Sequence, residues 1–343
     1  MSGTRQHFLP KFILKGFSSK FHNSNYFVWI YRKESEPYET NIVNVAVQKN
    51  FYSIKNNSYI DDLITKEENK FSNLVKYLRS LKNNFDITGD SEILNIAELI
   101  SHLEIRTRNI RKALLDGSNL FLEEILIFFQ NPENRKKFVS TQMEKAINLQ
   151  LLKLSIPLYK RANIKAQMKK ELQPKIELQF SYFFNNVLPN SSNEMKNIVK
   201  QGHLRAFNRE ISPQIRQKEY KELKWRLIFN ENENLIMGDC GILTEVESVK
   251  RFVLLWNKEE KVKNIFFPIS NQHLLVGSKV NSTLHLDTYH FNEEISKLSR
   301  EFFISAKNEP SLRTLADNIG LHSQLITKNE MLKICDELFS SYI

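Results

Sequence analysis

The sequence is poor in cysteine, glycine and proline. Its 343 residues include only two cysteines, Cys240 and Cys335, and nine each of glycine and proline. Two cysteines cannot form a disulfide framework or a four-cysteine zinc site, and they favour a reducing, cytoplasmic setting. The few glycines are scattered, so the sequence has neither a phosphate-binding loop nor a dinucleotide-binding fingerprint. The residues identify no cofactor.

Long apolar runs are also missing. The most apolar helical stretch, 120–129, is short and carries Glu123 and Glu124, whereas a membrane span needs eighteen or more apolar residues. The first seven residues contain a single arginine with no apolar signal core behind it. We therefore expect a protein that is not exported, that works in the cytoplasm and that has no membrane partner.

Spacings typical of metal sites do not occur. The best candidate is the group His285, Asp287 and His290. On a strand, His285 and Asp287 would lie on one face and His290 on the other. A catalytic zinc site needs three converging protein ligands, so no metal site is predicted.

The sequence is rich in apolar and basic residues. Hydrophobic residues make up 41% and aromatic residues 11% of the chain, which is typical of a folded globule. The net charge is +10, and residues 135–226 contain 20 Lys plus Arg against 7 Asp plus Glu, a difference of +13 that leaves about −3 for the rest. This basic block either binds the phosphates of a nucleic acid or is a solvated helical face, and composition alone does not decide between them.

Short aromatic and β-branched runs predict strands at both ends of the chain. The first is 26–31, with 42–47 and 51–52 as its partner, and the others are 225–229, 235–237, 266–269 and 273–277. Neither group is large enough for a stable sheet alone. We therefore expect residues 1–60 and 220–290 to share one mostly antiparallel sheet.

Between the two strand regions the periodicity is helical, from Asp61 to about Lys224. The clearest helix begins at Asp90 or Ser91 and places His102 and Arg106, four residues apart, on one flank. A further helix is expected at 292–306. The core-facing stripe of the clearest helix is Ile96, Ile100, Leu103, Thr107, Ile110 and Leu114.

These patterns predict an α+β fold, with a mostly antiparallel sheet built from N-terminal and C-terminal segments and a large, basic, all-helical middle region. The predicted domains are a discontinuous sheet-containing core of residues 1–60 and 220–306, a helical region of 61–219 and a C-terminal helical tail of 307–343.

One turn carries a candidate functional carboxylate. The strands at 225–229 and 235–237 lead into Gly238, Asp239, Cys240 and Gly241. A carboxylate at a strand end is held by rigid backbone and can act as an acid, but it can equally accept hydrogen bonds from the N–H groups of its own turn. The turn-capping interpretation is favoured. Because the flanking glycines already permit a tight turn, an Asn at this position is expected to leave the fold intact.

Several short motifs, taken together, resemble the domain-of-unknown-function 4238 (DUF4238) family of bacteria. The family opens with a His, an aromatic residue, a Pro three positions after the His, and then Phe, Leu and Phe. The resemblance spans about residues 5 to 306 in the same order. The matching segments are His7 to Phe17, Val28 to Tyr31, Asn50 to Ser53, Ile96-Ala97 to Arg106-Thr107, Trp225, Ile236 to Ile242, and Phe267 to Ser270.

The chain departs from the family pattern at the turn. Gly238 stands in place of the usual Ser, Cys240 in place of Asn and Gly241 in place of Pro. The residues that match the family's polar positions are His7, Arg106 and Asp239. Members of the family look like single-gene anti-phage defence proteins, so the resemblance implies a defence context but carries no settled reaction.

We therefore expect an anti-phage effector that acts on nucleic acid, RNA rather than DNA, as a nuclease. His7 would act as general base or acid, Arg106 would stabilise the charge of the phosphorane, and Asp239 would orient the histidine. Lys169, Lys170 and Lys175 would bind the nucleic acid.

The alternative is a non-enzymatic sensor or binding protein that recognises a phage component. In that case the three polar motif residues are structural. A phage-encoded trigger is expected in either case, and the residues do not indicate an oligomeric state.

Overall fold

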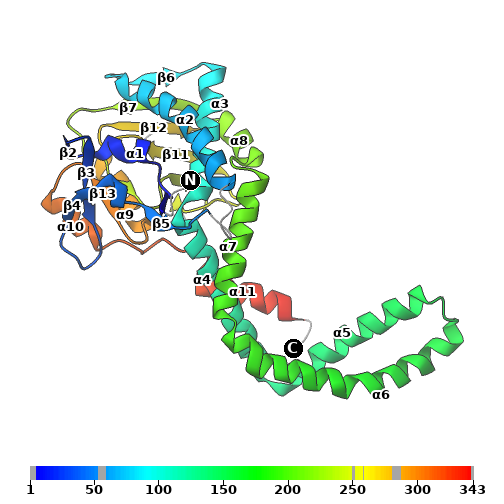
Figure 1. Cartoon of the computed structure of the whole chain (residues 1–343). Helices are drawn as coiled ribbons and strands as arrows, with labels where there is room; N and C mark the ends of the chain where they lie inside the picture. Colours follow the sequence, from blue (N-terminus) through cyan, green and yellow to red (C-terminus); the bar gives the residue numbers. More distant parts are fainter. Residues whose placement is uncertain (1–4, 53–58, 249–251, 258, 280–286, 341–343) are drawn as a thin grey trace. The chain divides into compact units, whose positions relative to one another are not determined.

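The computed structural model describes residues 5–52, 59–248, 252–257, 259–279 and 287–340. Within these residues the chain is an α+β protein, as the sequence predicts, with antiparallel sheets from N-terminal and C-terminal segments and a helical middle region (Figure 1). It divides into two compact units. Unit 1 comprises Met1–Leu114 and Lys200–Leu325, and unit 2 comprises Leu115–Val199 and Ile326–Ile343.

The largest sheet of unit 1 is formed mainly by residues 224–278. Its strand order is β10-β9-β11-β12-β7-β6, and all neighbours are antiparallel. In the register of β7 and β12, Trp225 lies opposite Gly277. The strands are β6 (Phe85–Ile87), β7 (Lys224–Phe229), β9 (Leu243–Val246), β10 (Phe252–Val253), β11 (Val262–Pro268) and β12 (His273–Ser278).

A second sheet joins the two ends of the chain, in the order β2-β3-β13-β8 with β4 beside β3, and β1 pairs separately with β5. The expectation of one shared sheet is therefore wrong, because the described strands fall into three sheets. The long strands of 224–278 pair with one another and leave only β8 and β13 to join the N-terminal strands. The strands are β1 (Arg5–His7), β2 (Lys20–His22), β3 (Asn25–Tyr31), β4 (Tyr38–Asn41), β5 (Val47–Lys49), β8 (Met237–Gly238) and β13 (Phe303–Ser305).

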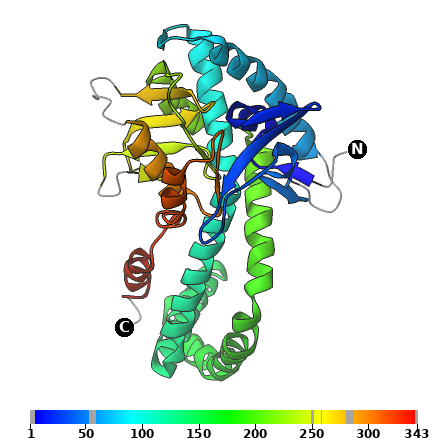
Figure 2. The same cartoon turned by 90° about the vertical axis from the view of Figure 1, so that its left-hand side faces the viewer.

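The strands β9, β11 and β12 of the six-stranded sheet are buried on both faces, because successive residues point to opposite sides and nearly all of them are buried. Ile265 and Phe267 of β11 belong to a core shared with α2 (Tyr59–Ser80), α3 (Asp90–Arg106) and the N-terminal strands. Phe266 belongs to a core shared with α9 and α10. Figure 2 shows the cyan helix α3 between the blue N-terminal strands and the yellow strands. The remaining helices of unit 1 are α1 (Lys11–Leu14), α8 (Gln214–Lys221), α9 (Thr288–Leu298) and α10 (Pro310–Ala316).

Unit 2 is helical and contains a hairpin of two long helices, α5 (Pro132–Lys153) and α6 (Leu158–Tyr182) (Figure 1). Buried residues spaced four apart on α5, among them Met143, Ile147 and Leu151, pack against partly buried residues of α6. An aromatic cluster around Phe129 forms a second contact region. Helix α11 (Lys328–Phe339) belongs to unit 2, and α4 (Arg108–Gln130) and α7 (Ser192–Arg209) have residues in both units.

Two predicted helices end earlier than their apolar periodicity suggests. The first stops at Arg106, because Thr107 has extended backbone angles (φ −67°, ψ 150°) and α4 begins one residue later. The helix predicted for 292–306 ends at Leu298, and β13 follows. At the first position the residues on either side are buried in two different cores, Leu103 in one and Ile110 in the other, whereas at the second position Leu298 and Phe303 share one core. Apolar periodicity therefore continues through both positions.

The predicted strand 235–237 is only partly formed, since β8 covers Met237–Gly238 alone. The side chain of Asn292 takes the place of a neighbouring strand. Its Oδ1 accepts a hydrogen bond from the Ile236 N–H at 3.0 Å, and its Nδ2 donates to the Asn234 carbonyl at 3.0 Å. The backbone of this segment is thus satisfied without strand pairing.

The two units divide the chain at positions that differ from the predicted domain boundaries of 60/61, 219/220 and 306/307. Helices α2 and α3 were expected in the helical region, but they share the core of unit 1. Their buried apolar faces share a core with the strands of unit 1. Residues 307–325 likewise belong to unit 1.

None of the described helices is both long and apolar enough to cross a membrane.

Gly277→Ala is expected to destabilise unit 1. A Cβ at this position would lie 2.8 Å from the Trp225 ring, closer than atoms in contact can approach. Overpacking of this kind costs about 1–3 kcal/mol, measurable by urea unfolding. The matched control is Gly202→Ala on α7, where no atom lies within 4 Å of the added Cβ. It is expected to be neutral or to stabilise by about 0.5–1 kcal/mol, because Ala favours helix. Equal effects of the two substitutions would contradict the packing of Trp225 on β12.

Candidate functional site

Arg106, the last residue of α3, lies at the centre of a buried polar cluster in unit 1. Its side chain is 2% exposed. Its Nε donates to Tyr52 Oη at 2.6 Å, and one Nη2 donor reaches the backbone carbonyl of His7 at 2.7 Å. The same nitrogen pairs with the Glu68 carboxylate at 2.5 Å. Burial alone would lower the pKa of Arg106, but Tyr52 and Glu68 outweigh it, so the guanidinium is charged and occupied within the protein.

His102, one turn before Arg106, is fully buried and neutral. Burial, followed by the charge of Arg106, lowers the pKa of its imidazole to about 3. Its Nδ1–H donates to the Ile211 carbonyl at 3.0 Å, which leaves Nε2 to accept from Arg106 Nη1 at 3.3 Å. The spacing of four residues noted in the sequence therefore corresponds to a direct contact.

His7 contacts Arg106 through its backbone and not through its imidazole. The side chain is half-buried, and burial, followed by the charge of Lys11, lowers the pKa of His7 to about 4, so the ring is neutral at pH 7. Two carboxylates lie near the cluster on α2. Glu68 is 27% exposed, and burial raises the pKa of Asp61. This is the part of the cluster that solvent reaches.

A second arginine repeats the arrangement on the next helix. Arg111 Nε donates to His203 Nδ1 at 3.0 Å, and His203 Nε2 in turn donates to the Ile105 carbonyl at 2.7 Å. Arg111 Nη2 donates to the Phe51 carbonyl at 3.0 Å, and the guanidinium lies 3.8 Å from the centre of the Phe51 ring. Arg106 and Arg111 thus hold the Phe51–Tyr52 segment from two sides.

Asp239 is buried in the turn after β8 and has other partners. Its Oδ1 accepts from Asn109 Nδ2 and from the Arg300 N–H, both at 2.8 Å, and its Oδ2 accepts from the Glu301 N–H at 2.8 Å. Burial outweighs these hydrogen bonds and raises the pKa of Asp239 to about 6. The Asp239 carboxylate binds the backbone N–H groups of Arg300 and Glu301, which directly follow α9, and these contacts favour the end of that helix at Leu298.

The neighbours of Asp239 are suited to packing. Burial raises the pKa of the Cys240 thiol far above its usual range, so Cys240 is not a nucleophile. Gly241 has a positive φ of 79°, and a Cβ there would lie 3.3 Å from Leu9 and 3.6 Å from Thr107. The turn therefore lies against the residue that follows Arg106.

The structure brings together two of the three predicted catalytic residues, His7 and Arg106. The hydrogen bonds described for the Asp239 side chain go to Asn109, Arg300 and Glu301, so the predicted Asp–His contact is not among them. All three residues belong to the interior of unit 1 or its margin. The geometry is that of residues that hold the chain together.

The predicted nucleic-acid-binding residues lie on α6 in unit 2. Lys170 and Lys175 are exposed. Lys169 is partly buried and forms an ion pair with Glu144 of α5.

Residues that sequence reasoning missed are Tyr52, Glu68, Arg111 and His203. Tyr52 was noted only as part of a motif. Arg111 lies five residues after Arg106 and its partner His203 is 92 residues away, so no local spacing indicates the pair. The feature of the sequence that could have indicated these contacts is the presence of two arginines, Arg106 and Arg111, beside the apolar stripe of 96–114.

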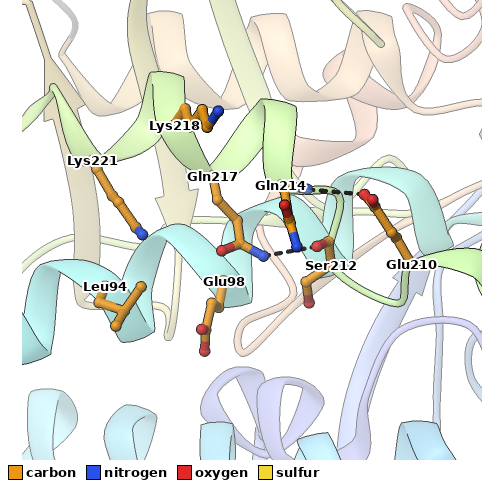
Figure 3. A pocket seen from close by; sticks show the side chains of 8 residues that line it. All are labelled: Leu94, Glu98, Glu210, Ser212, Gln214, Gln217, Lys218 and Lys221. Atoms are coloured by element: carbon orange, nitrogen blue, oxygen red, sulfur yellow. Dashed lines mark hydrogen bonds between the residues drawn. The ribbon is translucent and has the colours of Figure 1, made fainter.

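The described residues also form an open pocket of about 500 Å³ between α3 and α8 (Figure 3). Several of its polar groups are engaged by the protein. Glu210 accepts from the Gln214 N–H at 3.0 Å, and Gln217 donates to the Ser212 carbonyl at 2.7 Å. Glu98 pairs with Lys70. None of the predicted site residues lines this pocket.

In the part of the chain that the structure describes, no group of three or more His, Cys, Asp or Glu side chains is placed to hold a metal. Asp287 instead caps α9, where it accepts from the His290 N–H at 2.8 Å. His285 lies outside the described residues.

Fold and site together define an α+β protein whose antiparallel sheets are tied to helices by buried arginines and a buried aspartate. The family model described as a protein of unknown function, DUF4238, matches residues 5–306. The chain belongs to the DUF4238 family, which confirms the resemblance of its short motifs. Neither the curated proteins nor the solved structures contain a match to it.

Arg106→Lys is expected to lower the melting temperature by several degrees. Lysine keeps the charge but not the fork of donors, and each buried acceptor left without a donor costs about 1–3 kcal/mol. Tyr52 Oη and the His7 carbonyl are the acceptors that would lose their donor. The control is Arg226→Lys, whose ion pair with Asp86 is exposed and should contribute little. An unchanged melting temperature in Arg106→Lys would show that the cluster does not stabilise the fold.

Asp239→Asn is expected to destabilise the protein, which differs from the expectation drawn from the turn alone. Both carboxylate oxygens accept hydrogen bonds, and the NH₂ group of Asn would face a donor, at a cost of about 1–3 kcal/mol. Thermal unfolding at pH 8 measures the loss. Asp287→Asn is the control, because Asn caps a helix as well as Asp does. Equal stability of wild type and Asp239→Asn would argue for a functional carboxylate.

Proposed function

We propose that the protein is a nucleic-acid-binding protein of bacterial anti-phage defence, with RNA as its expected ligand, and that it acts by binding rather than by catalysis. The supporting observation is the charge of the helical hairpin α5–α6. Residues 132–182 contain eleven Lys plus Arg and four Asp plus Glu, a difference of +7. Clustered cations of this kind release counterions from a nucleic-acid backbone and so favour binding.

The exposure of the hairpin supports the same proposal. Helix α6 has no buried residue along its 25 positions, and its exposed side chains Lys160, Lys170 and Lys175 are solvated and available to a ligand. Lys145, Lys153 and Lys160 are exposed together with Lys170 and Lys175. A solvated structural face would balance its charges with acids, as Lys169 and Glu144 do, but acids are few here.

Binding is favoured over catalysis by the state of the polar motif residues. A residue that stabilises a transition state must point its donors at the substrate, whereas Arg106 directs them to Tyr52, His7, His102 and Glu68. Asp239 is sealed among backbone N–H groups. The defence context rests on the family resemblance, and a phage component is the expected trigger.

An RNA nuclease remains the second candidate, and one observation favours it. His7 is half-buried and neutral at pH 7, and it belongs to the cluster that contains the partly exposed Glu68. A neutral imidazole can take a proton from a ribose hydroxyl. Loss of RNA cleavage in His7→Ala, with the melting temperature unchanged, would establish this candidate in place of binding alone.

Replacement of Lys170 and Lys175 by Glu is expected to weaken RNA binding by about 10-fold or more at low salt, because the phosphate contacts of both positions are lost. Binding by the wild type should itself fall steeply between roughly 50 and 200 mM salt. Filter binding measures both effects, and gel analysis of the recovered RNA shows whether it is intact.

The matched control carries Glu at Lys33 and Lys76, two exposed positions of unit 1. It has the same net charge as the test variant and is expected to bind as the wild type does. If the wild type fails to bind RNA at low salt, or if both charge-reversed variants lose the same affinity, the hairpin is not the binding surface.

A further inference from the structure

The hairpin contains one long segment without any acidic residue. Residues 145–170, here called the hairpin tip, lie between Glu144 and Glu171 and include the end of α5, the turn and the first half of α6. Their seven basic residues are Lys145, Lys153, Lys160, Arg161, Lys165, Lys169 and Lys170. The positive charge of unit 2 is therefore concentrated in this segment.

Large apolar side chains are exposed in the same segment. Leu149 is 53% exposed, Leu152 59%, Leu154 67%, Leu158 80% and Tyr159 77%. The inner faces of the two helices are already occupied, since Leu151 packs in a core with Ile156 and Ile164. The exposed residues therefore lie on the remaining faces. Exposed apolar side chains grouped in this way mark an interaction surface.

The charge of the hairpin tip and the arrangement of its apolar and basic residues restrict which partners can bind it. A second copy of the tip would bring seven basic residues against seven others with no acid between them, which is unfavourable. A helix that lies on a membrane has its apolar and basic residues on opposite faces. In α6 the two kinds are mixed on one face, because Lys170 follows Tyr159 by eleven residues, or about three helical turns.

Among nucleic acids, a single strand fits this mixture better than a duplex. A duplex presents its phosphates outward and keeps its bases stacked inside, so the exposed Leu and Tyr side chains would find no partner. A single strand presents phosphates for the lysines and unstacked bases for the aromatic and apolar side chains. Tyr159 is the exposed aromatic residue of the tip, and the Lys160 ammonium lies 5.6 Å from the centre of its ring.

We propose that the hairpin tip binds single-stranded nucleic acid, with bases stacking on Tyr159 and packing on Leu158 while Lys153 and Lys160 contact phosphates. This inference rests on the proposed function and specifies its substrate class. The aromatic and apolar side chains provide the preference for single strands, and the basic side chains provide most of the affinity.

The test uses the full chain and fluorescence anisotropy with two probes, a single-stranded RNA of about 20 nucleotides and the duplex of the same sequence. The wild type is expected to bind the single strand about 10-fold or more tightly than the duplex. Tyr159→Ala should weaken single-strand binding by about 5- to 100-fold and change duplex binding little. Tyr159→Phe keeps the ring and should restore the affinity.

Tyr77→Ala is the matched control, because Tyr77 is 47% exposed on α2 of unit 1. It should bind both probes as the wild type does. Since Tyr159 is exposed, the melting temperature of Tyr159→Ala should equal that of the wild type.

Other results of these binding measurements would contradict either the preference for single strands or the proposed RNA binding. Equal affinity for single strand and duplex, with loss of both on reversal of Lys170 and Lys175, removes the inference and leaves the proposed function standing. If neither the single strand nor the duplex binds at low salt, the inference and the proposed function are both wrong. Equal losses in Tyr159→Ala and Tyr159→Phe exclude stacking. If Tyr159→Ala loses only binding to vesicles of anionic lipid, the tip is a membrane-binding element and the inference is wrong.

Discussion

The fold of unit 1 depends on guanidinium groups that donate to backbone carbonyls. Arg106 binds the carbonyl of His7, and Arg111 binds that of Phe51. Arg79 of α2 does the same for Phe12 at 2.7 Å, Ile13 at 2.9 Å and Ile269 at 2.7 Å. Arginine is suited to this role because its planar fork reaches several acceptors at once. In each case a helix is joined to a segment that is distant in the sequence.

These contacts explain features that seem unrelated in the sequence. Gly16 is required because a Cβ there would lie 2.4 Å from both the Arg79 guanidinium and the Ile269 carbonyl. His102 and His203 are neutral because burial, followed by the charge of the neighbouring arginine, lowers the pKa of each imidazole, and each ring accepts a hydrogen bond from that arginine. Asp239 is the counterpart of the arginines, since it binds backbone N–H groups where they bind carbonyls. Motif residues that look catalytic in the sequence thus contact the buried backbone.

The two units differ in how far their polar side chains are exposed to solvent. Unit 1 directs its motif residues inward, so little of their chemistry is available to a ligand. Unit 2 leaves basic and apolar side chains of α5 and α6 in solvent. Burial of a charge requires a partner, whereas an exposed cation can exchange water for a phosphate. For this reason the hairpin, and not the Arg106 cluster, is the surface we assign to binding.

Much of the fold was predictable from local pattern. The sequence alone determined strands β3, β7, β11 and β12, the start of α3 near residue 90, and the basic character of the helical middle, because these follow from the spacing of side chains along the chain. It also determined the family, since short motifs recur in order from residue 5 to 306. The fold class followed from the positions of these elements.

Only the tertiary structure decided where α3 and α9 end, how the strands divide among sheets, and which groups the polar motif residues contact. Arg106 and the His7 carbonyl are 99 residues apart, and Asp239 and Asn109 are 130 apart. Periodicity reports only on near neighbours, while a buried polar group must bind whichever distant donor or acceptor the packed core brings to it. The role of a motif residue is therefore set by packing that no local pattern contains.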